Sequence, residues 1–164
     1  MTVSQFLNYA QGTLAPTESL FLLVPSDKIG WKPTERSFTL GQLMHHMAAA
    51  LQFNADGIGK NEWALPSMRH IFVANRKIST VNVDEALKLY HQSAKIFLDI
   101  FSSISDDEFQ TGEVDSIQLG RVQKWRIALF AVDHHLRHMT ELFMYLKVLG
   151  LNISSKELYG AGEH

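Results

Sequence analysis

Apolar residues recur at helical spacing over most of the chain, in four long segments that polar connections separate. Side chains three and four positions apart share one face of an α-helix, so this pattern predicts helices that each bury one side. The expected helices cover residues 2–24, 39–58, 82–103 and 124–149. Pro16 should break the first into a kinked helix or two short ones, because its ring removes a backbone donor and collides with the preceding turn.

Local capping signals mark the ends of these helices. Thr2 and Thr39 each precede a glutamine three positions later, which is the capping-box pattern of a helix start. Asn82 is followed by acidic residues, which favour the positive end of the helix dipole. Gly150 suits the left-handed conformation that often follows the last helical turn. The fourth helix is therefore expected to stop there.

The remaining segments are expected to be connections, and they cover residues 25–33, 59–80, 105–120 and the tail 151–164. Two of these connections carry weak signals of regular structure. A short helix is expected around residues 68–75, and residues 114–118 alternate weakly between polar and apolar, as locally paired extended chain does.

Four amphipathic helices without a convincing sheet predict an all-α fold, a four-helix bundle that forms a single domain over residues 1–164. The connections are longer than simple antiparallel neighbours need, so a crossover topology is allowed. Periodicity alone does not choose between the possible topologies.

Composition narrows the class of protein further. A chain of 164 residues that is 46% hydrophobic can bury one core without disulfides, and it has no cysteine to form one. A net charge of −2 gives no electrostatic footprint for nucleic acid or an anionic membrane surface. Neither a signal peptide nor a run of about 18 apolar residues is present, so we expect a soluble, cytoplasmic protein.

Histidines supply the candidate chemistry. His134 and His138 are four positions apart, so their side chains leave one face of the last helix about a turn apart. That helix is too apolar for a solvated strut, and unpartnered imidazoles are costly to bury there. His46 on the second helix can supply a third ligand. Ala49, Ala50 and Phe53 lie on the same side of this helix as His46. Because the alanine side chains are small, we expect space beside His46, with these three residues as a pocket wall.

The other five histidines are expected to stay outside this site. His45 and His135 are each one residue from a proposed ligand, hence rotated by about 100° around the helix, so they should face other groups or solvent. They could act at most as hydrogen-bond partners of the ligands. His70, His91 and His164 stand alone, which favours surface or structural roles.

Other metal chemistries of helical bundles fit less well. A carboxylate-bridged di-iron site needs Glu-x-x-His pairs, and a metalloprotease needs His-Glu-x-x-His, but the sequence contains neither. The sequence also allows a haem that is held by two axial histidines. Three convergent histidines suit a small divalent ion better, and a three-ligand site leaves coordination positions for water or substrate.

The order and spacing of these motifs resemble the DinB/YfiT-like family of metalloenzymes. Positions 43–47, Leu-Met-His-His-Met, are similar to the family's helix-two motif, and residues 134–150 are similar to its helix-four motif. The family follows its second histidine with Arg-Gly-Gln, whereas this chain has Met-Thr-Glu at 139–141. The ending Tyr-Leu-Lys-Val-Leu-Gly at 145–150 matches the family's run more closely.

The resemblance implies an up-down-down-up four-helix bundle and a divalent ion held by His46, His134 and His138. Nickel or zinc is the expected ion, with iron or manganese as alternatives, and members of the family frequently dimerise. Some relatives are transferases or isomerases that depend on low-molecular-weight thiols. We therefore also expect a homodimer that is formed through apolar helix faces.

The combined expectation is a divalent-metal-dependent enzyme that acts on a small molecule, either as a transferase dependent on a low-molecular-weight thiol or as a hydrolase. Glu141 lies two turns after His134 on the same face, so it could accept a proton or hold a ligating histidine. An exposed glutamate without a role fits that position equally well. The alternative function is a non-catalytic metal-binding bundle with a structural or stress-related sensing role.

Overall fold

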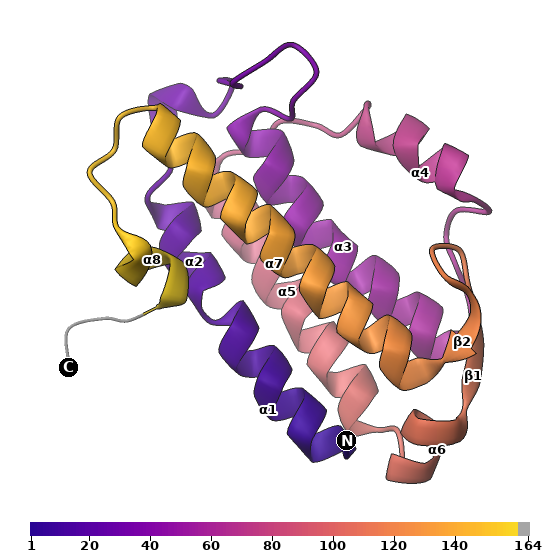
Figure 1. Ribbon diagram of the computed structural model, residues 1–164. Helices are drawn as coiled ribbons and strands as arrows, with labels where there is room; N and C mark the ends of the chain where they lie inside the picture. The colour runs from indigo at the N-terminus through magenta and orange to yellow at the C-terminus, as the bar shows by residue number, and fades with distance from the viewer. Residues whose placement is uncertain (161–164) are drawn as a thin grey trace.

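Four helical arms pack side by side in the computed structural model, which describes residues 1–160 (Figure 1). The all-α four-helix bundle expected from the periodicity is confirmed, with a small two-stranded sheet added. In chain order the elements are α1 (Val3–Leu14), α2 (Pro16–Leu22), the 3-10 helix η1 (Ser26–Lys28), α3 (Leu40–Lys60), α4 (Met68–Asn75), α5 (Val83–Ser102), α6 (Asp106–Thr111), β1 (Glu113–Ser116), β2 (Gly120–Gln123), α7 (Lys124–Val148) and α8 (Ser155–Tyr159).

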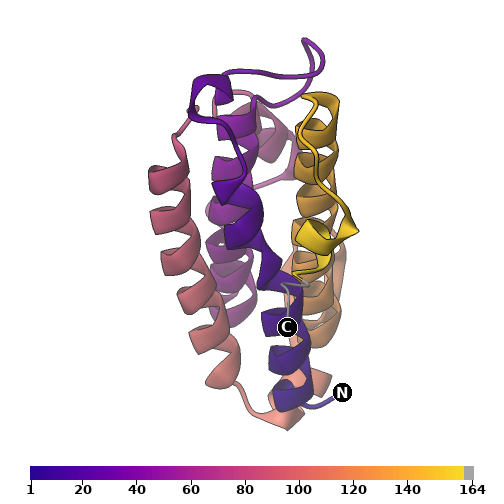
Figure 2. The same ribbon diagram turned by 90° about the vertical axis from the view of Figure 1, so that its left-hand side faces the viewer.

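The helices follow the up-down-down-up order. α1 and α2 rise from the N-terminus as one arm, α3 and α5 both descend, and α7 rises again (Figures 1 and 2). Because α3 and α5 run in the same direction, the chain must cross back along the bundle between them, and α4 lies in this crossover (Figure 1). α3 packs mainly against α5 and α7, and α1 packs against the same two helices, so α3 lies diagonally opposite α1 in the bundle.

The capping signals act as the sequence predicted. Side chains of Thr2, Thr39 and Asn82 accept hydrogen bonds from backbone N–H groups three residues later, at 3.2, 3.1 and 2.9 Å. Each forms a full capping box. Pro16 is the first residue of α2 and divides the first arm into two helices. Gly150 has φ +91°, the left-handed conformation expected after α7.

Three short helices, η1, α6 and α8, differ from the expectation. α6 and α8 lie in segments that were expected to be irregular, since helices of six and five residues carry too little periodicity to detect. The locally paired extended chain expected at 114–118 is confirmed in β1, which ends at Ser116 and pairs antiparallel with β2, Val114 opposite Val122. Gly120, with φ +72°, permits the tight return between the two strands.

A cluster of phenylalanines closes the end of the bundle where α1 begins and α5 ends. The ring of Phe6 lies 4.8 Å from that of Phe101 and 5.2 Å from that of Phe109, measured between centroids. All three side chains are fully buried, which ties α1, α5 and α6 together. Among the helices of residues 1–160, none combines the length and apolar character needed to cross a bilayer.

Candidate metal centre

Three histidines from two helices meet at one point. His46 comes from α3, and His134 and His138 come from successive turns of α7. One ring nitrogen from each lies within 4.8 Å of the others. Metal–imidazole bonds of about 2.0–2.1 Å place two ligand nitrogens at most about 4 Å apart, so movements below about 1 Å would bring all three onto one ion. The structure thus brings together the three residues that the sequence singled out.

The environment keeps two of these rings neutral. His46 is buried and His134 is half-buried. Burial, followed by the charge of neighbouring histidines, lowers the pKa of His46 to about 3 and the pKa of His134 to about 4. Both values lie well below the ordinary 6.5, so these imidazoles are unprotonated at neutral pH. The neutral ring is the form that binds a metal ion.

Glu141 fixes the orientation of the third ring. Its Oε2 accepts a hydrogen bond from Nδ1 of His138 at 2.8 Å, and its Oε1 accepts one from the hydroxyl of Tyr145 at 2.7 Å. The bond from His138 is the main cause of the lowered pKa of the Glu141 carboxyl, while burial chiefly raises the pKa of Tyr145 to about 12. A proton held on Nδ1 leaves Nε2 of His138 as the free electron-pair donor.

Aromatic rings cover the imidazoles. Phe38 stacks on His46 with 5.2 Å between ring centroids and meets His138 edge-on at 6.5 Å. Phe130 stacks on His134 at 6.2 Å. These rings exclude water from part of the cluster and restrict the rotation of the histidines, which keeps the three ligand atoms close to a common point.

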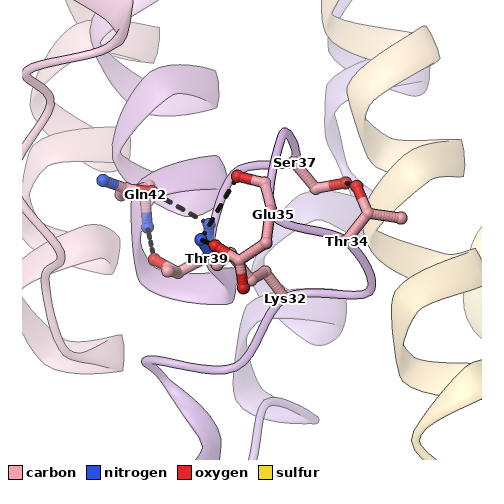
Figure 3. Close-up of polar contacts among 6 residues, drawn as sticks. All are labelled: Lys32, Thr34, Glu35, Ser37, Thr39 and Gln42. Atoms are coloured by element: carbon pink, nitrogen blue, oxygen red, sulfur yellow. Dashed lines mark hydrogen bonds and ion pairs between the residues drawn. The ribbon is translucent and has the colours of Figure 1, made fainter.

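Phe38 lies in a loop, residues 29–39, that is held by its own polar contacts (Figure 3). Nζ of Lys32 lies 2.9 Å from the carboxylate of Glu35, and the hydroxyls of Thr34 and Ser37 are 2.8 Å apart. The loop is also joined to the start of α3, because the N–H of Leu40 donates to a carbonyl within it at 2.9 Å. These contacts position the loop over the histidines.

A cavity of about 840 Å³ opens beside the three imidazoles. As the sequence predicted, its α3 wall contains Ala49, Ala50 and Phe53 beside His46. Side chains from the 29–39 loop and from α4 form the opposite side. The volume is within the range of small-molecule sites, so a ligand of moderate size can reach the histidines.

The histidines next to the cluster face elsewhere, as expected from the helical rotation. Nδ1 of His45 lies 3.1 Å from the carbonyl oxygen of Ser79. His135 is only 2% exposed, and its Nε2 lies 2.9 Å from the hydroxyl of Thr17 across the bundle. Neither contacts a ligand candidate through these bonds, so the role of hydrogen-bond partner falls to Glu141 instead.

The isolated histidines occupy the surface positions expected of them where the structure describes them. Nδ1 of His70 lies 2.8 Å from the hydroxyl of Ser67, and Nε2 of His91 lies 3.0 Å from a carboxylate oxygen of Glu18. His164 lies outside the described residues. Phe38, the residue before the capping Thr39, gave no signal of a role in this site. Tyr145 could have been found, since it is one helical turn after Glu141.

The donor set fits a divalent ion. Three neutral imidazoles suit zinc, nickel, copper or ferrous iron, and they leave further coordination positions free. Within residues 1–160 this is the one group of metal-ligating side chains with such convergence. All three histidines line the cavity, so a ligand that enters it could reach an ion that they would hold.

Comparison with known proteins identifies the family and the fold. The sequence model of the DinB superfamily matches residues 11–142. A DinB-like protein of Bacillus subtilis, YjoA, superposes with a TM-score of 0.68 at 16% identity, over 90% of this chain and 93% of that one. No curated protein sequence matches the chain.

Two structures of a mycothiol-dependent maleylpyruvate isomerase are also similar. A single-residue variant of that enzyme superposes with a TM-score of 0.69 at 18% identity over 87% of this chain, and the unmodified enzyme with 0.64 at 18% over 96%. The chain spans only 61% and 65% of these two isomerase chains. Identities this low show a shared fold and nothing finer.

Proposed function

The chain belongs to the DinB superfamily, and on that premise we propose that it is a metal-dependent enzyme in which His46, His134 and His138 hold one divalent ion. Its substrate would be a small molecule bound in the adjoining cavity. Nickel or zinc is the proposed ion, and iron or manganese would also accept this donor set.

The observation that carries this proposal is the meeting of the three-histidine cluster and the cavity. A structural metal site is closed by four protein ligands, whereas a catalytic site keeps a position open. Only three ligating side chains converge here among the described residues, and all three line the cavity of about 840 Å³. The open side therefore faces the space that a substrate would fill.

The protein's own residues prepare this site in three ways. Burial holds His46 and His134 in the neutral form, so their nitrogens can donate electron pairs. Glu141 holds the proton of His138 on Nδ1. Phe38 and Phe130 limit the access of water. A bound divalent ion would supply Lewis acidity, which lowers the pKa of a neighbouring thiol or water toward neutrality.

Glu141 is better placed to position a ligand than to move a proton of the substrate. Both of its oxygens accept hydrogen bonds from side chains, and the residue does not line the cavity. We therefore propose a positioning role for Glu141. Direct proton transfer by this carboxylate stays a prediction that substitution can test.

A thiol-dependent transfer is the reaction that we favour over hydrolysis. The support is the fold shared with an enzyme described as mycothiol-dependent. The chain contains no cysteine, so a thiol would have to come from a second small molecule. The open side of the cluster offers the place where such a thiol could lose its proton.

The test is metal analysis of protein purified without an affinity tag, followed by assays of the metal-loaded protein with low-molecular-weight thiols and with simple esters and amides. We expect about one ion per chain and turnover with a thiol. Stoichiometric metal without turnover, and without any spectral response of the cobalt- or nickel-substituted protein to these compounds, would favour the structural or sensing alternative.

A further inference from the structure

The cavity beside the histidines carries unpaired positive charge. Arg36, from the 29–39 loop, and Arg76, just after α4, both line it. Neither arginine forms an ion pair within residues 1–160. The remaining charged groups of the lining, Lys32 and Glu35, are 2.9 Å apart and neutralise each other. The cavity is thus locally positive in a chain whose net charge is −2.

The middle of the cavity is apolar. α4 has no buried residue, and its Met68, Ile71 and Phe72 line the cavity, with Phe72 60% exposed. Ala49 and Phe53 of α3 lie on the other wall. An apolar helix face that the protein itself does not cover gains stability when a ligand's apolar surface covers it.

α4 stands apart from the bundle, and the segments on both sides of it are tied to α3 or to the sheet (Figure 1). The side-chain amide of Gln42 donates to the carbonyl oxygen of Ile78 at 2.9 Å, and His45 contacts the next carbonyl, that of Ser79, at 3.1 Å. These bonds hold the segment after α4 against the start of α3. They also keep Arg76 close to the cavity.

We propose that this cavity binds organic carboxylates with an apolar body, the carboxylate pairing with Arg36 and Arg76 and the apolar body lying between α4 and α3. The inference rests on the proposed function, since it names the substrate class of the same site. Arginine is suited to this task because its planar guanidinium pairs with both oxygens of a carboxylate and is always charged.

A matched set of three probes tests the charge preference. These are 4-phenylbutyrate, 4-phenylbutan-1-ol and 4-phenylbutylamine, which share one apolar body and differ in charge. Titration calorimetry with metal-free protein removes direct coordination of the carboxylate. We expect the carboxylate to bind about tenfold more tightly than the alcohol, and the amine to bind most weakly.

Substitutions in the cavity wall show which residues cause the preference for the carboxylate. Arg36→Gln combined with Arg76→Gln should weaken carboxylate binding about tenfold and leave the alcohol unchanged, because only the charge partner is lost. Arg69→Gln is the matched control, since Arg69 is an exposed arginine of α4 that does not line the cavity. Ile71→Ser should weaken all three probes by a similar factor, because it removes apolar wall without changing the charge.

Two outcomes would overturn the inference: equal binding of the three probes, or a carboxylate preference that survives in the double arginine variant. Failure of the proposed function shows itself separately. If the protein binds no metal and shows no turnover but still prefers the carboxylate through Arg36 and Arg76, the proposed ligand class is supported and the proposed enzyme function is contradicted. If the metal-loaded protein is active but shows no preference for the carboxylate, the enzyme function is supported and the ligand class is contradicted.

Discussion

The surroundings of each ring decide which histidines can bind an ion. His46 is buried and His134 half-buried, both without an acidic hydrogen-bond partner, while His138 has Glu141 on its far nitrogen. His45 has similar chemistry one position away, but it contacts a backbone carbonyl of the α4–α5 connection. The identity of a residue therefore says less about its role than the direction in which its helix points it.

Removing any one ligand should remove the metal. We expect His46→Ala, His134→Ala and His138→Ala each to lose bound ion, because two imidazoles hold a divalent ion far more weakly than three. Elemental analysis of tag-free protein measures this. His45→Ala is the control for solvent-side histidines, and His135→Ala, checked for folding, is the control for buried ones. Normal metal content in the His46 variant would contradict the assignment.

Glu141→Gln should lower turnover while the ion stays bound. The amide oxygen can still accept a hydrogen bond from His138, but the negative charge that strengthens the ligand is lost. We expect a decrease in activity of about tenfold or more. Metal content and kcat are measured together, with Tyr145→Phe as the companion that removes the other hydrogen bond of the carboxylate. Unchanged kcat in Glu141→Gln would show that the contact has no role in the reaction.

Acid should destabilise the metal-free protein, in part through His135. Burial lowers the pKa of His135 to about 3, below the 6.5 of an unfolded histidine. Below pH 6.5 the unfolded chain thus binds a proton that the folded chain does not, so stability falls as the pH falls toward 3. In His135→Leu the free energy of unfolding between pH 6 and 4 should depend on pH less steeply, by about 1.4 kcal/mol per pH unit. Urea unfolding at several pH values measures both slopes, and equal slopes would contradict the burial of a neutral ring.

Among the helical elements, α4 differs most from the others in how it is held. α3, α5 and α7 each bury a full face, whereas α4 buries no residue and shares few contacts with other elements. Its sequence still forms a helix, because the chain before and after it is anchored and the segment has helical spacing. The cavity wall that α4 forms is therefore packed less firmly than the wall that α3 forms.

Backbone amides of α4 should exchange with solvent much faster than those of α3. Local opening of a helix with few buried contacts costs little free energy, while opening of α3, which buries a full face, requires disruption of the core. Hydrogen exchange followed by mass spectrometry resolves the two segments. Addition of 4-phenylbutyrate should slow exchange in α4 alone. Exchange in α4 as slow as in α3 would show that the helix is held more firmly than its contacts indicate.

At the scale of the whole molecule, the surface retains apolar side chains that a single copy does not cover. Met144 and Val148, one turn apart on α7, are 51% and 65% exposed, and Leu22 of α2 is 61% exposed. We expect a homodimer through these helix faces, and Met144→Glu should weaken it. Light scattering at micromolar concentrations measures the mass. A monomeric wild-type protein would contradict this prediction, and a monomeric variant beside a dimeric wild type would support it.

The sequence by itself determined the features that depend on neighbours within one or two helical turns. The capping boxes at Thr2, Thr39 and Asn82, the break at Pro16 and the stop at Gly150 are all local, and each is found where it was expected. The shared face of His134 and His138 follows from helical geometry in the same way. α6 and α8 are too short to give such a pattern.

Tertiary structure alone decided which distant residues meet. His46 joins the other two candidate ligands only because α3 packs against α7, and His135 meets Thr17 only because α2 packs against α7 as well. The two arginines share a cavity because the crossover carries α4 over α3. Such contacts depend on how the whole core packs, and the spacing of residues along one segment contains no record of that packing.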